Sequence, residues 1–135
     1  YGADHPDSLL GIAPFATVIG GHQTLAKFGR DDLVAMKIEN TKEVVKKIDW
    51  EPFKKDILKY DIVPEAHKFT MPILMMVGDK DIGTPLEDQM KLYDSMPDNK
   101  EIHIIKGAPH TFEEAKHLLK MKQIIHNWID NKLVK

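Results

Sequence analysis

The stretch from residue 71 to residue 112 constrains the fold of this chain more than any other part. Residues 73–77 form a continuous apolar run, which is typical of a strand buried on both faces. Turn-forming residues follow at 78–83, and a second apolar strand pattern at 101–106 leads into a loop at 107–110. With a helix between them, these runs predict two parallel strands in a strand–helix–strand unit.

Helix-start signals occur on both sides of the second strand pattern. Thr84 with Glu87 is a capping box that predicts a helix from Pro85 onward, and this helix should end before Pro97. A similar box at residues 111–114 predicts the start of the last helix, with Thr111 as its cap. The expected buried stripe of that helix is Ala115, Leu118, Leu119, Ile125, Trp128 and Ile129, whereas His117 is expected to face solvent.

Two chemically active side chains come directly after the two strand patterns. Asp81 follows the first strand and His110 follows the second. The carboxyl ends of neighbouring parallel strands lie about 5 Å apart at one edge of a sheet, where open α/β sheets bind ligands. A carboxylate beside an imidazole can fix the tautomer of the ring and stabilise the imidazolium, as general-base catalysis requires. We therefore expect Asp81 and His110 to form a catalytic pair.

The segments PILMMVGDKDIGTP and EIHIIKGAPHTF together resemble the last third of the α/β-hydrolase fold. The likeness is to small esterases, acylglycerol lipases and serine-peptidase-like members. In that superfamily the catalytic acid lies in a G-x-x-D turn after the penultimate strand, and the histidine lies in a G-x-x-H turn after the last strand. These positions correspond to Asp81 and His110. The resemblance implies an α/β fold with parallel strands and flanking helices.

The opening of the chain suggests that the nucleophile lies outside it. Residues 1–13 read as a helix end, a His-Pro-Asp turn and a strand at 9–13, which the resemblance equates with the sixth core strand. In that superfamily such a helix end follows the nucleophile by about one helix length, so the resemblance implies a G-x-S-x-G elbow upstream of Tyr1. Ser8 and Ser95 are the only serines of the chain, and neither has that context. Residues 1–135 are thus interpreted as the C-terminal part of one hydrolase domain, inactive alone. Its open sheet edge would favour a homodimer or association with the N-terminal part.

The resemblance implies a small helical lid over residues from about 16 to 70, because insertions between the sixth strand and the acid-bearing strand form a lid in that superfamily. These residues of the chain hold no strand pattern, residues 50–60 have helical spacing, and the stretch is longer than a plain crossover needs. Met36, Trp50 and Phe53 either line an acyl pocket or anchor the lid to the sheet, and the sequence leaves both interpretations open.

Charge and composition exclude several classes of partner. The net charge is −2, and Arg30 is the only arginine among 19 basic residues, which argues against nucleic-acid binding. Without cysteine there are no disulfides or thiolate metal sites. Neither a cofactor nor a metal is implied. The sequence shows no membrane-span or signal-peptide pattern, so a soluble, cytoplasmic protein is expected.

Two other sequence patterns are candidates for a functional site beside the expected pair. Asp79-x-Asp81-x-Gly83 is similar to the start of a calcium loop, but Gly83 and Met90 occupy ligand positions that need oxygen donors. Asp79 is instead expected to shape the turn. Residues 20–22 (Gly-Gly-His) have the wrong order and place for an oxyanion loop.

Three functions are therefore compatible with the sequence. The first is a serine hydrolase that cleaves ester, thioester or peptide bonds when the chain is complete. In the second, the same fold uses an aspartate nucleophile, as dehalogenase-like members do. The third is a non-catalytic α/β module that binds a partner through its open edge.

Overall fold

The computed structural model describes residues 2–17, 19–20 and 50–134. The chain divides into two units, one formed by residues 1–17 and 63–135 and the other by residues 18–62. In the smaller unit, helix α4 spans Trp50–Ile57, and Gly20 pairs with Asp61 in an antiparallel bridge. The predicted lid falls largely on residues 21–49, which lie outside the described residues, as do Met36 and the side chains of Trp50 and Phe53.

The larger unit is organised around strand β1, Ile73–Gly78, in which all six residues are buried. Strand β2, Lys100–Ile105, pairs with it in parallel, so that Ile73 lies opposite Lys100 and Gly78 lies opposite Ile105. The parallel pair expected from the two apolar runs is confirmed. The continuous apolar character of β1 follows from this position, because side chains on both of its faces are removed from water.

Residues 11–16 run along the other side of β1, where the sequence predicted a strand at residues 9–13. Ile12 donates its N–H to Pro72 O at 3.0 Å, and Leu74 donates to Ile12 O at 2.9 Å. The pairing consists of isolated parallel bridges, Ile12 with Ile73 and Phe15 with Met76, and not of a continuous strand. Pro14 lies between these bridges and has no N–H to donate, which interrupts the ladder at its centre.

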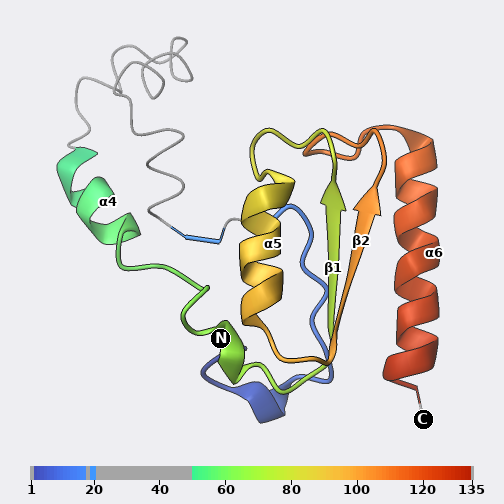
Figure 1. The fold of residues 1–135 in the computed structure, drawn as a ribbon, viewed down its shortest axis with the longest axis horizontal. Coiled ribbons are helices and arrows are strands. Elements are labelled where there is room, and N and C mark those ends of the chain that lie inside the picture. The colour runs from blue at the N-terminus through green and yellow to red at the C-terminus, as the bar shows by residue number, and fades with distance from the viewer. Residues whose placement is uncertain (1, 18, 21–49, 135) are drawn as a thin grey trace. The chain divides into compact units, whose positions relative to one another are not determined.

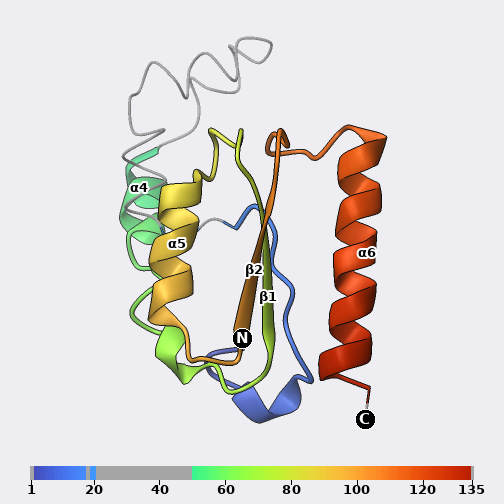
Figure 2. The ribbon, with the colours of Figure 1, turned by 45° about the vertical axis from the view of Figure 1, so that its right-hand side comes forward.

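Helices cover the strands from opposite sides (Figures 1 and 2). Helix α5 spans Leu86–Ser95 and helix α6 spans Ala115–Lys132, while the turns η1 (Pro6–Ser8) and η3 (Ala66–Lys68) are short 3-10 helices. Full burial of each large apolar side chain contributes about 1.5–3 kcal/mol, so the core between α6 and the sheet is a major source of stability. That core contains Leu74, Met76, Ile105, Ala108, Phe112, Met121, Ile124 and Trp128.

Both capping predictions are wrong. The residue that caps α5 is Pro85, and the Thr84 hydroxyl donates to the Asp81 carboxylate at 2.6 Å instead. Helix α6 begins after Glu114, and the Thr111 hydroxyl donates to the Glu113 carboxylate at 2.6 Å. In each case the threonine hydroxyl forms a hydrogen bond with a nearby carboxylate and not with the backbone N–H groups at the start of the helix.

The buried face of α6 also differs from the predicted stripe. His117, Met121, Ile124 and Trp128 are buried at spacings of four, three and four residues, so the expectation that His117 faces solvent is wrong. Leu118 and Leu119 are 53% and 67% exposed. The predicted stripe combined residues from two faces of the helix, and only one of these faces packs against the sheet.

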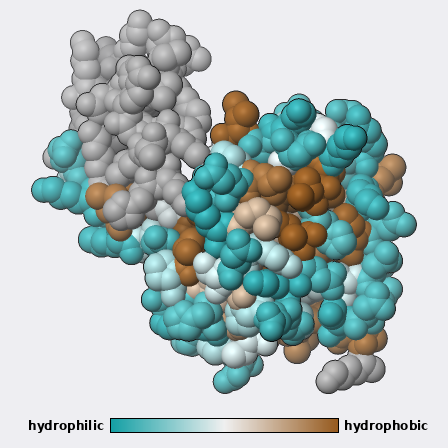
Figure 3. All heavy atoms as spheres, viewed as in Figure 1, coloured by the Kyte–Doolittle hydropathy of each residue, from teal (hydrophilic) through white to brown (hydrophobic). Residues whose placement is uncertain are grey.

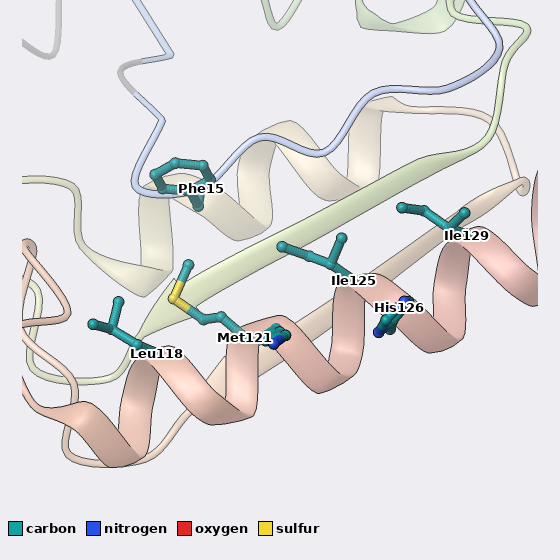
Figure 4. A pocket seen from close by; sticks show the side chains of 7 residues that line it. Phe15, Leu118, Met121, Ile125, His126 and Ile129 are labelled. Carbon is teal, nitrogen blue, oxygen red and sulfur yellow. The ribbon is translucent and has the colours of Figure 1, made fainter.

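Leu118 belongs to a shallow hydrophobic groove of about 500 Å³, seen in Figure 4. Its lining residues are Phe15, Leu118, Met121, Lys122, Ile125, His126 and Ile129. Hydrophobic side chains also gather over β2 in Figure 3, where Ile104 is 50% exposed. The larger unit therefore keeps apolar surface uncovered at the groove and along β2.

Replacement of Gly78 by alanine should destabilise the fold by about 2 kcal/mol, because the new Cβ would lie only 2.2 Å from Ala108 O. Gly83→Ala is the matched control. Its Cβ would meet no heavy atom closer than 3.4 Å, so the free energy of unfolding should change by less than about 1 kcal/mol. Urea denaturation measures both values. Equal stability of the two variants would contradict the close contact.

Candidate active site

The loops that follow β1 and β2 are bonded to each other at the carboxyl edge of the sheet. The Gly107 N–H donates to Asp79 Oδ1 at 2.6 Å, and the Lys80 N–H donates to Ala108 O at 3.0 Å. Gly107 has a positive φ of 79°, which glycine adopts without strain. Asp79, expected only to shape its own turn, thus connects one loop to the other.

Asp81 lies in the first loop with its side chain fully buried. Its Oδ1 accepts hydrogen bonds from the backbone N–H groups of Gly83 and Thr84, both at 2.8 Å. Its Oδ2 accepts from the Thr84 hydroxyl at 2.6 Å and lies 2.9 Å from His110 Nδ1. A carboxylate has about four lone-pair sites, so these four contacts use its full capacity.

These contacts keep Asp81 ionised although it is buried. Burial raises the pKa of the carboxyl group, because the charged form loses its hydration. The hydrogen bonds from the Thr84 hydroxyl and backbone, followed by the contact with His110, outweigh this effect and hold the pKa below its ordinary value. The site therefore contains a fixed negative charge at neutral pH.

His110 lies in the second loop with its side chain 52% exposed. An ionised carboxylate can only accept hydrogen bonds, so the neutral ring must carry its proton on Nδ1, which faces Asp81. Nε2 then has a free lone pair on the opposite side of the ring. The arrangement can take a proton at Nε2 and stabilise the imidazolium that results.

Two other histidines take no part in the hydrogen bonds of this pair. His103 lies on β2 with Nε2 3.6 Å from the Glu101 carboxylate, and His117 is buried in α6. Among the described residues there is no cluster that could hold a metal ion. In the same part of the chain, no helix is long and apolar enough to cross a membrane.

Thr84 is the site residue that the sequence analysis missed, since it was assigned to a helix cap. Its hydroxyl contacts Asp81 and lies 3.5 Å from His110 Nδ1. A threonine three residues after an aspartate in a turn is a pattern for a local side-chain hydrogen bond, so the signal was present in the sequence.

Titration of Asp81 should show a midpoint below the ordinary value of 3.8, measured from its carboxyl ¹³C shift by NMR. A lowered folded-state pKa means that the unfolded chain binds more protons as the pH falls. The stability from ionised Asp81 is therefore fully present above the unfolded-state pKa. It is lost as the pH falls through the folded-state value, so the stability difference from Asp81→Asn should shrink there. A midpoint above 3.8 would contradict the hydrogen-bond arrangement.

Several solved structures share this architecture, although no protein-family model and no curated protein matches the chain. An α/β-hydrolase enzyme, MGS-MChE2, from a sediment metagenome of the Mar Chica lagoon in Morocco has a TM-score of 0.64 and 17% identity over 96% of this chain and 54% of its own. The Pyrococcus furiosus esterase PF2001 has a TM-score of 0.70 and 13% identity, over 98% and 48%.

A monoacylglycerol lipase from Paleococcus ferrophilus has a TM-score of 0.60 and 21% identity, over 95% of this chain and 61% of its own. The chain thus spans roughly half the length of these three structures, between 48% and 61%. At such low sequence identity, the likeness to these structures shows a shared fold alone. The chain has the fold of part of an α/β hydrolase, as the two strand-end motifs predicted.

Proposed function

We propose that this chain supplies the acid and the base of a serine hydrolase that cleaves ester, thioester or peptide bonds. The observation that carries the proposal is the 2.9 Å contact between Asp81 Oδ2 and His110 Nδ1 at the ends of adjacent parallel strands. The hydrolase fold of the matched structures supports it. In this reaction His110 is the general base and Asp81 orients it.

The proton path follows from the burial of the two side chains. Asp81 is enclosed and ionised, whereas the His110 ring is half exposed. A serine hydroxyl at the open side of the ring would give its proton to Nε2 as its oxygen attacks the acyl carbon. The imidazolium would then protonate the leaving group. In the second step a water molecule would give a proton to Nε2 as its oxygen attacks the acyl carbon, and the imidazolium would return a proton to the serine oxygen as the acyl group leaves.

The nucleophile is proposed to lie in a preceding part of the protein, because neither serine of this chain is placed for the reaction. Ser8 donates its hydroxyl to His5 O at 2.8 Å, and Ser95 donates to Lys91 O at 2.8 Å. Ser8 precedes the segment beside β1 and Ser95 ends α5, so both lie at the edge opposite the two catalytic loops (Figure 1). We therefore expect residues 1–135 alone to be inactive.

The free side of residues 11–16 is where we propose that the rest of the hydrolase fold joins. Ile12, Pro14 and Ala16 direct their backbone groups toward β1. Within the described residues, the backbone groups of Gly11, Ala13 and Phe15 form no hydrogen bond. Phe15 also lines the hydrophobic groove beside α6, so one segment could pair with the edge while apolar side chains cover the groove.

A fluorophosphonate probe tests the proposal in a longer protein that contains this chain and the preceding part of the fold. The serine should be labelled, and His110→Gln or Asp81→Asn should slow labelling by about 10³-fold or more. His67→Gln is the matched control, because His67 is exposed in η3 and lies outside both the pair and the hydrophobic groove. Residues 1–135 alone should not be labelled.

The outcomes separate the three functions. Labelling that persists in the His110→Gln variant at the rate of the His67→Gln control would overturn the proposed roles. No labelling of an intact protein whose elbow carries aspartate would indicate a dehalogenase-like nucleophile. No labelling of an intact protein with neither nucleophile would favour a non-catalytic binding module.

A further inference from the structure

Thr84 is buried, with 5% of its surface exposed, and its hydroxyl contacts both members of the pair. It donates to Asp81 Oδ2 at 2.6 Å, and its oxygen lies 3.5 Å from His110 Nδ1. Oδ2 is also the oxygen that faces His110. The Thr84 side chain therefore acts on the one atom through which Asp81 can orient the imidazole.

The carboxylate of an aspartate cannot hold its own orientation, because the terminal torsion of the side chain is broad. The backbone N–H groups of Gly83 and Thr84 fix only Oδ1. A hydrogen bond to Oδ2 adds a second restraint, so that rotation of the carboxylate would break hydrogen bonds at both of its oxygens. The Thr84 hydroxyl provides it from a buried, β-branched side chain whose first torsion is stiff.

His110 is poorly suited to provide that second restraint by itself. Its side chain is 52% exposed, so water competes for its ring nitrogens, whereas the Thr84 hydroxyl is shielded from solvent. The bond from Thr84 is also the shorter of the two contacts to Oδ2. The hydroxyl thus holds Oδ2 at the position where the imidazole meets it.

We propose that Thr84 is a positioning residue for the reaction proposed above, holding Asp81 Oδ2 toward Nδ1 so that the neutral His110 ring keeps its proton there. The inference rests on the proposed function for its catalytic meaning, but the tautomer it specifies belongs to this chain alone. The inference gives Thr84, which lies three residues after Asp81 in the same turn, a role in the chemistry of His110.

The test uses residues 1–135 labelled with ¹⁵N-histidine, at alkaline pH where imidazoles are neutral. The His110 signals are assigned from the His110→Gln variant, and their ¹⁵N shifts give the ratio of the Nδ1–H to the Nε2–H tautomer. Thr84→Val removes the hydroxyl with little change of shape. It should lower the ratio about fivefold, the factor expected when one hydrogen bond of ordinary net strength is lost. Thr84→Ser keeps the hydroxyl and should retain the wild-type ratio.

Each outcome decides the inference. An unchanged tautomer ratio in Thr84→Val would overturn the inference. An equal fall of the ratio in Thr84→Ser would overturn it as well, because the effect would then come from packing of the methyl group. If Thr84→Val does not fold, Thr84→Ala carries the same measurement. A wild-type ring without an excess of the Nδ1–H tautomer would overturn the Asp81–His110 pair itself and, with it, the proposed function.

Discussion

Gly78 and the Ala108 carbonyl group approach so closely that the loops carrying Asp81 and His110 can lie against each other. Two parallel strands that end side by side bring their loops near, but the loops must still touch closely for side chains to bond across them. The absence of a Cβ at residue 78 permits this approach, and the Asp79–Gly107 and Lys80–Ala108 hydrogen bonds maintain it. Asp81 and His110, separated by 29 residues, meet because of these contacts.

The two members of the pair differ in exposure, and this difference gives each its chemistry. Asp81 is enclosed by hydrogen-bond donors, which keep it ionised at neutral pH while its side chain is shielded from water. His110 shares a hydrogen bond with that charge but keeps the other side of its ring open. A buried acceptor and an accessible base are what a proton shuttle requires. The open groove and the unpaired side of residues 11–16 are the surfaces at which we propose that the rest of a hydrolase fold joins.

Features that follow from the spacing of apolar residues and the positions of turn residues could be predicted from the sequence. The continuous apolar run of β1, the turn after it and the loop after β2 were sufficient to place Asp81 and His110 at one edge. Where two partners compete for one side chain, the sequence contains the signals for both and does not show which partner is bonded. Thr84 and Thr111 have the spacing of helix caps, but carboxylates take their hydroxyls. The face of α6 that packs on the sheet was also mispredicted, because apolar residues occur on two of its faces.

The free energy of unfolding of four proteins, the wild type, Asp81→Asn, His110→Gln and the double variant, tests the central claim most directly. Residues that share a hydrogen bond show an interaction energy in such a cycle, typically about 0.5–3 kcal/mol, whereas separated residues add independently. The structure predicts a favourable interaction of about 1 kcal/mol or more at neutral pH, because the bond involves an ionised carboxylate. Additive effects of the two substitutions would show that the two side chains do not meet, and the catalytic pair would be contradicted.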